Sequence, residues 1–387
     1  MTPDASLAAG YERFSRTSFF TSLDGLRAIS ILAVIWHHAS ESAFPAATRL
    51  VHEGNRGVHL FFVISAFLIS TLLLRAKRRG ALDVPRFWCR RALRILPLYY
   101  AVLLGYVGLV WYLERGPAGQ AFFANLPAFA TFTSNWFVEL DGRVIFYFAW
   151  SLAAEEQFYL CWPWVERGFG RASPAFLALG LLVVTQLAGL AYVAGAQTLP
   201  LKILSSVPAA ILLGVILAHV LDSARGYHAV ARFAGRRGSA WAAATAVLVA
   251  LWFQRDLGFF GELLVAVTLT FLVATCVVRE DNDFARALRL RPVAWIGTIS
   301  FGIYLLHVLC IRAVRGVLAA AHLESVGLLF LGSTLLSVAI ASVSYLTYER
   351  FFLRLKDRWF SDRRPAVVAP PPPAATKVPA VATSLPG

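Results

Sequence analysis

The feature that most constrains this chain is a series of long apolar runs that recur between residues 28 and 347. A helix of ~20 apolar residues crosses the ~30 Å hydrocarbon core of a bilayer. Charged residues make up only 15% of the 387 residues, whereas soluble domains contain about a quarter. The sequence therefore predicts an all-α integral membrane protein whose helices form one bundle.

Ten of these runs are candidate spans, and the charges between them predict their direction. They cover residues 24–41, 57–74, 96–113, 147–165, 174–194, 203–221, 239–254, 259–278, 293–312 and 326–347. With ten spans, the basic segments after the second, sixth, eighth and tenth spans all fall on one side of the membrane. Because basic loops stay in the cytoplasm, we expect both chain ends there, in a multi-pass protein of the cytoplasmic or inner membrane.

The formal charge of +14 does not indicate a nucleic-acid partner. The basic residues lie in short loops between apolar runs, which is the pattern of a membrane protein that follows the positive-inside rule. The four cysteines, Cys89, Cys161, Cys276 and Cys310, have no partners at metal-ligand spacing. We interpret them as small buried apolar residues, and we expect no disulfide, no metal site and no bound cofactor.

Composition divides the chain into three regions. Residues 1–22 are polar and contain no apolar core, so we expect no cleavable signal peptide. Residues 23–355 form the membrane domain, and residues 356–387 form a cytoplasmic tail rich in proline and alanine that we expect to be disordered. Within the membrane domain, residues 81–95 mix aromatic and aliphatic side chains with arginines, which predicts a short helix lying in the membrane interface.

The first span carries two ionisable residues on one face. Arg27 and His38 are eleven residues apart, which is about three helical turns and a rise of about 16 Å. His37 is rotated away from that face by about 100°. A neutral imidazole inside the membrane can accept a proton from a hydroxyl group. A histidine that only packs against a neighbouring helix explains the spacing equally well.

The fourth span begins with a second polar stripe. Ser151, Glu155 and Tyr159 follow one another at four-residue intervals, and Glu156 lies on an adjacent face. Carboxylates inside a membrane need a cation, a histidine or a water-filled cavity as a partner. The stripe therefore indicates either a functional site or an ion pair that holds two helices together.

The ninth span repeats the arrangement. Ser300, Tyr304 and His307 share one helical face. For Ser300 we favour a helix-packing role, whereas for His307 a functional and a packing role are equally supported. At the end of the tenth span, Tyr348 and Glu349 are interpreted as an anchor in the membrane interface.

Taken together, these segments resemble the acyltransferase-3 family of integral membrane O-acyltransferases. The resemblance covers nearly the whole chain, from residue 23 to about residue 355, and its motifs occur in order with the expected gaps. The motifs are LDGLRAISILAVIWHH (23–38), GVHLFFVISAFLIS (57–70), FWCRRALRILPLYY (87–100), WSLAAEEQFYL (150–160), ISFGIYLLH (299–307) and YERFF (348–352).

The resemblance implies transfer of an acyl group, usually acetyl from acetyl-CoA, to a hydroxyl of a saccharide, such as a polysaccharide or glycolipid sugar, or of a secondary metabolite. His38 is then the general base, Glu155 orients it or an equivalent histidine, and Arg27 binds the donor or stabilises the developing charge. The residues that we expect to bind the donor or the acceptor are Arg90, Arg91, Arg94, Tyr159, Tyr304 and His307.

Three positions depart from the family pattern. His59 stands where an acid is usual, Ala66 where glycine is usual, and Arg350-Phe351 where a basic residue and proline are usual. The arginine–histidine pair and Glu155 match the pattern, so the catalytic interpretation is kept. The hydrolase-like domain of some members is not expected here.

A second class of function fits several of the same observations. A transporter or flippase for a lipid-linked sugar also needs polar residues inside the membrane, but the chain lacks the paired, broken spans of two symmetric halves that many transporters show. A membrane scaffold without activity does not explain the intramembrane histidine and glutamate. The acceptor, the acyl chain length and the oligomeric state stay open.

Overall fold

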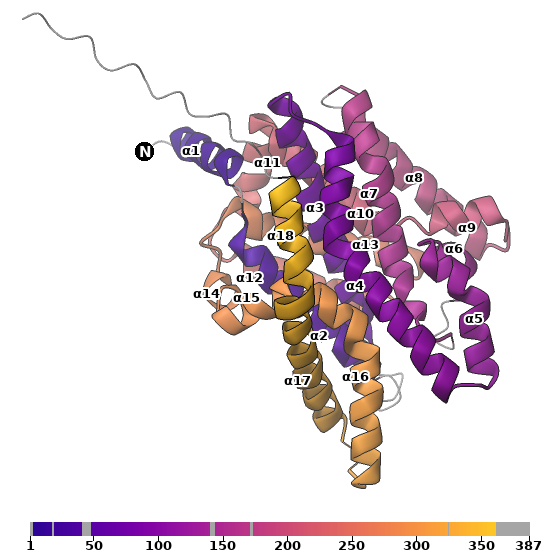
Figure 1. The fold of residues 1–387 in the computed structure, drawn as a ribbon. Helices are drawn as coiled ribbons and strands as arrows, with labels where there is room; N and C mark the ends of the chain where they lie inside the picture. Colours follow the sequence, from indigo (N-terminus) through magenta and orange to yellow (C-terminus); the bar gives the residue numbers. More distant parts are fainter. Residues whose placement is uncertain are drawn as a thin grey trace, which may run out of the picture.

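The computed structural model describes residues 3–17, 19–40, 48–139, 144–170, 173–323 and 325–360. The described chain contains helices and no strands (Figure 1), so the prediction of an all-α protein is confirmed there. The first half contains α1 (Pro3–Arg16), α2 (Thr21–Ser40), η1 (Arg49–Arg56), α3 (Gly57–Arg78), α4 (Val84–Leu113), α5 (Pro117–Ala130), α6 (Ser134–Phe137), η2 (Tyr147–Ala149) and α7 (Trp150–Gly168).

The second half is helical in the same way, and its last three elements follow one another as one long helix, Val326–Trp359. Its elements are α8 (Ser173–Val193), α9 (Leu199–Ser205), α10 (Ala209–Asp222), α11 (Ala224–Ala234), α12 (Ser239–Phe253), α13 (Phe259–Val278), α14 (Ala285–Leu288), α15 (Arg291–Thr298), α16 (Ser300–Ala320), α17 (Val326–Ser344), η3 (Tyr345–Glu349) and α18 (Arg350–Trp359). The element η3 is a π-helical turn that joins α17 to α18.

Six helices of the described chain are long and apolar enough to cross a membrane, and the number rises to eight if each of two bent pairs counts as one span. The pairs are α1 with α2 and α9 with α10. The helix α12 is apolar but shorter. These helices support a multi-pass membrane protein, while the count of ten and the cytoplasmic ends remain predictions.

The prediction of a separate interfacial helix at residues 81–95 is wrong. Apart from its first three residues, this segment is the beginning of α4, which continues without a break to Leu113. Asp83 caps the helix by accepting a hydrogen bond from the backbone N–H of Arg86 at 3.0 Å. Pro97 lies inside α4 and does not end it, as membrane helices tolerate proline when neighbouring groups satisfy the freed carbonyls. The Tyr348 hydroxyl donates to the carbonyl oxygen of Pro97 itself at 3.2 Å, which links η3 to α4.

Two predicted spans have different boundaries in the structure. The run 203–221 is divided between α9 and α10, which meet at an angle of 48°, because Pro208 precedes the first turn of α10. The run 293–312 is divided between α15 and α16, and α16 continues to Ala320. In Figure 1, α16 and α17 project together beyond the rest of the bundle. The predicted tail begins inside α18, and residues 361–387 lie outside the described chain.

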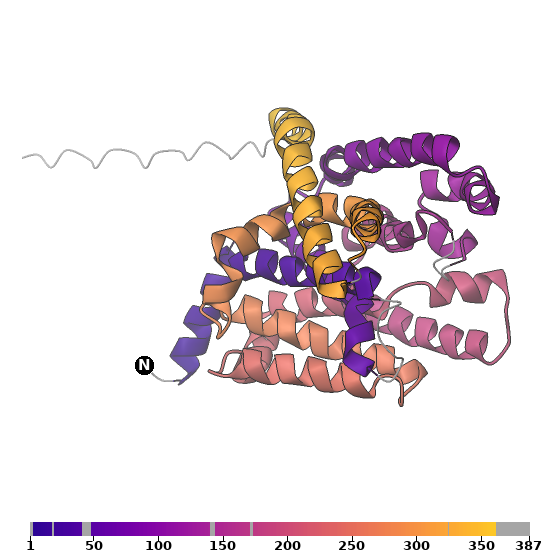
Figure 2. The ribbon, with the colours of Figure 1, turned by 90° about the horizontal axis from the view of Figure 1, so that it is seen from below.

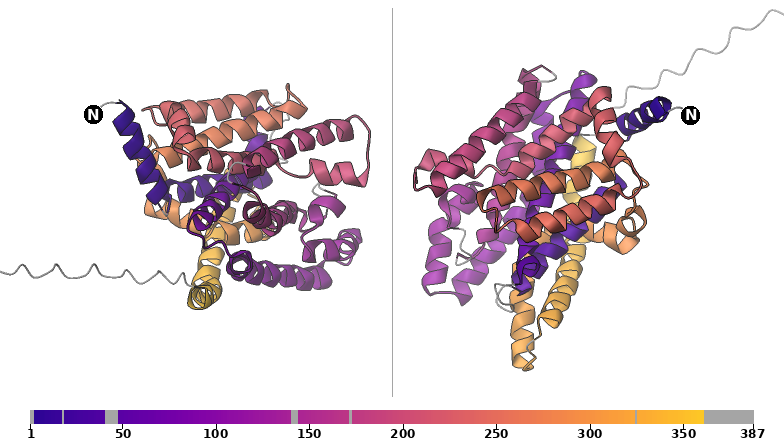
Figure 3. Two further views of the ribbon diagram at one scale, coloured as in Figure 1. Left: turned by 90° about the horizontal axis from the view of Figure 1, so that it is seen from above. Right: turned by 180° about the vertical axis from the view of Figure 1, so that it is seen from behind.

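The helix α2 lies inside the bundle, in contact with η1, α3, α15, α16 and α17. Seen from below, α2 runs between the layer of α12 and α13 and the side that carries α4 and α18 (Figure 2). The view from behind shows α12 and α13 side by side (Figure 3). Because α2 contacts so many elements, its side chains meet residues from distant parts of the sequence.

Glycines let neighbouring backbones approach α2 closely at both of its ends. A Cβ atom on Gly297 would lie 1.9 Å from the backbone oxygen of Asp24, and one on Gly54 would lie 2.3 Å from that of Ala33. No larger residue fits in either place without a shift of backbone. These contacts hold α15 against the end of α2 that carries Arg27, and η1 against the end that carries the histidines.

Candidate active site

Two histidines that are far apart in the sequence face each other in the structure. The ring of His38, near the end of α2, lies 5.0 Å from the ring of His307 in α16, measured between centroids. The ring of His37 lies 5.1 Å from that of His38. The side chain of His307 is fully buried. The arrangement brings three imidazoles into one small polar region inside the bundle.

The hydrogen bond of His307 fixes its tautomer. Its Nδ1 atom lies 2.5 Å from the backbone oxygen of Tyr304, one turn earlier in the same helix. A carbonyl oxygen can only accept, so Nδ1 carries the proton and Nε2 carries the lone pair. Within the described chain that Nε2 atom is buried and has no hydrogen-bond partner. His307 therefore offers a basic nitrogen beside His38.

Two tyrosines border the histidine pair. The hydroxyl of Tyr147 lies 3.3 Å from Nδ1 of His38. The hydroxyl of Tyr304 donates to the backbone oxygen of Phe148 at 2.8 Å, and therefore accepts from the Ser151 hydroxyl at 2.6 Å. These bonds tie α16 to the beginning of α7 and hold the ring of Tyr304 at 5.4 Å from that of His307. The position of His307 is thus set by two helices.

Glu155 belongs to a second cluster, formed by α7 and α4. The hydroxyl of Tyr159 donates to Oε1 of Glu155 at 2.6 Å. The guanidinium of Arg91 lies over the ring of Tyr159, 3.9 Å from its centroid, and within electrostatic range of Glu155 and Glu156. The hydrogen bonds of the described chain include none from Glu155 to His38 or His307, but its charge acts on Tyr304.

Arginines gather at the end of α2 that is opposite to the histidines. Arg27 pairs with Asp24 at 3.1 Å. Arg94 is exposed, and its charge is close enough to interact with those of Arg27 and Arg91. Arg90, one turn earlier in α4, faces a different element and donates to the backbone oxygen of Phe360 at 3.1 Å. Of the predicted arginines, Arg27, Arg91 and Arg94 form one basic cluster.

Three residues of these clusters were not selected from the sequence. Tyr147 contacts His38, Asp24 neutralises part of the charge of Arg27, and Glu349 lies within electrostatic range of Arg94. Glu349, for which the sequence favours an interface anchor, lies in the π-helical turn η3, a feature that is frequent at functional sites. The sequence contained a signal for two of them: Asp24 lies in the LDG segment (23–25) and Glu349 in the YERFF motif (348–352).

Other parts of the chain are less suited to chemistry. Among the described residues, no group of three or more histidine, cysteine, aspartate or glutamate side chains could hold a metal ion. The cysteines are all free; Cys276 and Cys310 are buried as predicted, whereas Cys89 and Cys161 are exposed on α4 and α7.

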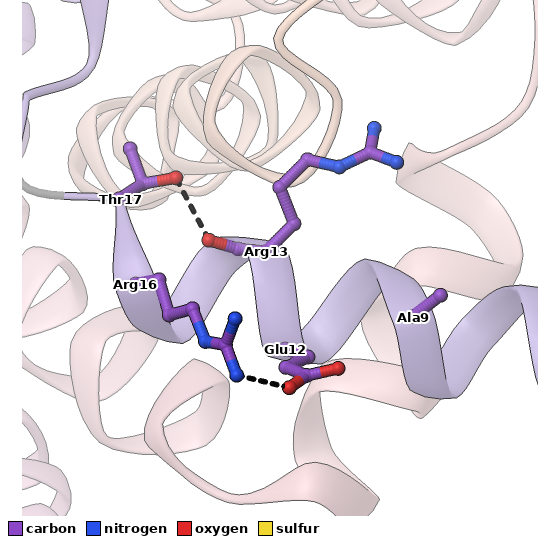
Figure 4. Close-up of a pocket in the computed structure, with 5 residues that line it drawn as sticks. All are labelled: Ala9, Glu12, Arg13, Arg16 and Thr17. Atoms are coloured by element: carbon purple, nitrogen blue, oxygen red, sulfur yellow. Dashed lines mark hydrogen bonds and ion pairs between the residues drawn. The ribbon is translucent and has the colours of Figure 1, made fainter. Parts of the chain in front are cut away.

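A cavity of about 390 Å³ lies on one face of α1 (Figure 4), where Arg16 pairs with Glu12. None of the predicted site residues lines it.

Comparison with known proteins identifies the family of the chain. The model of the acyltransferase-3 family, described as an acyltransferase domain, matches residues 20–348. The chain is 27% identical over 351 residues to a putative peptidoglycan O-acetyltransferase, YrhL, of Bacillus subtilis, with 77% of this chain and 49% of the relative covered. It is 29% identical over 341 residues to the peptidoglycan O-acetyltransferase OatA of Listeria monocytogenes, with 76% of this chain and 50% of the relative covered.

A shorter match leads to the same group of proteins. The chain is 33% identical over 163 residues to a putative O-acetyltransferase of Staphylococcus aureus, which covers 40% of this chain and 26% of the relative. No solved structure matches. The chain spans about half the length of the curated relatives that it matches over most of its own length. With a family model matched from residue 20 to residue 348, the chain belongs to the acyltransferase-3 family.

Proposed function

We propose that this protein transfers an acetyl group from acetyl-CoA to a hydroxyl of a saccharide at the cytoplasmic or inner membrane. The observation that carries the proposal is the pair of His38 and His307, whose rings lie 5.0 Å apart, with a basic cluster at the other end of α2. The names of the relatives, which are O-acetyltransferases of peptidoglycan, support a saccharide acceptor.

The basic cluster suits the donor. Acetyl-CoA carries several phosphate charges, and guanidinium groups bind phosphates through paired, charge-assisted hydrogen bonds. Arg94 is the exposed member of the cluster. Arg91 is held in place by the Tyr159 ring and Arg27 by Asp24. In the proposed reaction Arg94 and Arg91 bind the phosphates, and Arg27 binds the donor nearer to the thioester.

His38 acts as the general base in this reaction. It takes the proton of the acceptor hydroxyl as the hydroxyl oxygen attacks the thioester carbonyl. The new C–O bond forms, the C–S bond breaks, and the departing thiolate of coenzyme A takes the proton back from the imidazolium. His307, with its lone pair on Nε2, accepts a hydrogen bond from a neighbouring hydroxyl of the saccharide and so orients the acceptor. The two imidazoles thus bind two adjacent hydroxyls of the acceptor, and only His38 takes up a proton.

Glu155 has an indirect role in this proposal. Its carboxylate accepts a hydrogen bond from the Tyr159 hydroxyl. It also lies within electrostatic range of Arg91 and Tyr304. It therefore links the basic cluster to the helix that carries His307, and it holds Arg91 and Tyr159 in the geometry that the donor needs. The burial of His307 keeps water from the thioester, which would otherwise be hydrolysed.

The test uses the full chain reconstituted in lipid and acetyl-CoA labelled with ¹⁴C in the acetyl group. Envelope saccharides from the native membranes serve as acceptors, and label that mild base releases from the saccharides measures ester formation. We expect label in the saccharide fraction and free coenzyme A in equal amounts. Release of coenzyme A with no labelled ester, or no consumption of acetyl-CoA at all, would contradict the proposal.

A further inference from the structure

A second cavity, lined by charged, amide and aromatic residues, lies beside His37 and takes no part in the reaction described so far. It has a volume of about 810 Å³, within the range of ~300–1,000 Å³ that is usual for small-molecule sites. Its described walls come from α2, η1, α8, α9, α13 and the turn between α12 and α13. His37 lines it, and the ring of His37 contacts that of His38.

The cavity depends on how closely η1 approaches α2. A Cβ on Gly54 would lie 2.3 Å from the backbone oxygen of Ala33 and 3.0 Å from Cβ of His37. This contact places Glu53, on the same short element, beside the end of α2. In addition, Nδ1 of His37 lies 3.1 Å from the backbone oxygen of His52. The wall of the cavity is therefore built onto the same helix turn that carries the catalytic histidine.

The charges of the cavity are balanced. Arg56 pairs with Glu262 of α13 at 2.8 Å, and Arg255 pairs with Glu53 at 3.0 Å. These are the two guanidinium groups and the two carboxylates of the described lining. Balanced pairs offer many donors and acceptors without a net charge, whereas the cluster around Arg94 has an excess of positive charge. The two regions are therefore suited to different ligands.

The cavity also contains an unsatisfied polar group and aromatic walls. Gln254 lines it, is only 4% exposed, and has an Oε1 atom without a hydrogen-bond partner in the described chain. An unpaired buried acceptor is costly unless water or a ligand donates to it. Tyr192 and Phe259 supply ring surface beside it. Amide, charged and aromatic groups in one cavity are the combination that binds a sugar with several hydroxyls.

The position of the cavity separates it from the basic cluster. His37 lies ten residues after Arg27 on α2, which is a rise of about 15 Å. The first turn of α13 carries Glu262, at the end of the helix opposite to the basic segment that follows Val278. A ligand in the cavity and a ligand at Arg94 therefore approach the histidine pair from opposite ends of α2.

We propose that this cavity is the acceptor site and that it takes a neutral, hydroxyl-rich saccharide unit. The inference rests on the proposed acetyl transfer and adds to it where the acceptor binds. The paired side chains of Arg56, Glu262, Arg255 and Glu53 hydrogen-bond to sugar hydroxyls, and Gln254 accepts one more. The reacting hydroxyl passes His37 and reaches His38, while acetyl-CoA stays on the side of the arginines.

The experiment compares variants that alter the cavity with matched variants just outside it. Ser205→Trp, on α9, fills the cavity, and Leu199→Trp adds the same ring to the exposed start of α9. Glu262→Gln removes a carboxylate from the cavity wall, and Asp256→Asn removes one from the neighbouring pair with Arg49. Each is assayed in native membranes for labelled ester at saturating acetyl-CoA, and as purified protein for binding of acetyl-CoA by equilibrium dialysis.

We expect Ser205→Trp and Glu262→Gln to lower ester formation by about tenfold or more, with acetyl-CoA binding unchanged. Ser205→Trp excludes the saccharide from the cavity, and Glu262→Gln removes one charge-assisted hydrogen bond to it. Leu199→Trp and Asp256→Asn should resemble the wild type. If the wild type neither binds acetyl-CoA nor forms ester, the proposed function fails. If the wild type forms ester and the cavity variants match their controls, the acceptor site is elsewhere. A loss of acetyl-CoA binding in the cavity variants also overturns the assignment.

Discussion

The Nδ1 atom of His307 donates to the backbone oxygen of Tyr304 across 2.5 Å. Since this bond uses the only proton of a neutral imidazole, Nε2 is left as a base in a buried position. The ring of His38 lies against the same imidazole. The bond to Tyr304 is a contact within α16, so the tautomer of His307 is set by its own helix before any ligand binds.

Replacement of His38 tests the general base. His38→Gln should fold and insert normally but lose acetyl transfer by ~10²–10⁴-fold, because glutamine cannot take up and release a proton near neutral pH. His37→Gln should lose much less, since His37 contacts the base but does not replace it. Transfer is measured per mole of monodisperse protein in detergent. Near-normal turnover of His38→Gln would falsify the mechanism.

His307 can be tested with two amides that mimic different nitrogens. In His307→Asn the amide N–H takes the place of Nδ1 and keeps the bond to Tyr304, whereas His307→Gln reaches the place of Nε2. If the Nε2 lone pair orients the acceptor, the asparagine variant should keep its melting temperature and lose transfer by about tenfold or more. Full activity with asparagine would mean that His307 only packs.

The basic cluster makes a prediction about the donor. Arg94→Gln should raise the KM for acetyl-CoA by about tenfold or more, as expected for the loss of one hydrogen bond to a phosphate, and the effect should shrink at high salt. Arg90→Gln is the control, because Arg90 bonds to Phe360 at the end of α18. Steady-state kinetics with varied acetyl-CoA decides. Equal changes in KM for both variants would contradict the assignment of phosphate binding to Arg94 and not to Arg90.

A glycine contact can be tested through stability. In Gly297→Ala the added methyl group would lie 1.9 Å from the backbone oxygen of Asp24, so α15 and α2 must separate. Forced overpacking costs about 1–3 kcal/mol, and the melting temperature in detergent should fall. Gly105→Ala is the matched control, as a methyl group there meets no atom within 4 Å. Similar melting temperatures for the two variants would show that α15 is loosely attached.

Topology remains to be measured. Reporter fusions after Arg79, Arg237 and Arg291 should report a cytoplasmic position, and a fusion within residues 114–146 should report the opposite side. The reason is the concentration of basic residues in the three loops that carry Arg79, Arg237 and Arg291. Fusions with phosphatase and fluorescent reporters give complementary signals. A non-cytoplasmic signal after Arg79 would reverse the predicted orientation.

Much of the site could be predicted from the sequence because local spacing decides which residues share a helical face. The offset of eleven positions from Arg27 to His38, and of three from Tyr304 to His307, places each pair on one face of one helix. The recognition of the family was confirmed by the match over residues 20–348. Hydrophobic run length likewise predicted all-helical structure, since only the backbone of a helix satisfies its own polar groups in lipid.

The sequence by itself therefore determined the class of fold, the family and the faces that carry polar residues. The tertiary structure decided which faces meet: that His307 lies against His38, that Glu155 bonds to Tyr159, and that Arg90 faces α18. It also decided that residues 84–113 form one helix across Pro97. The reason is that periodicity is a property of a single helix, whereas contacts between helices depend on glycine-permitted approach and on side-chain packing between segments distant in the sequence.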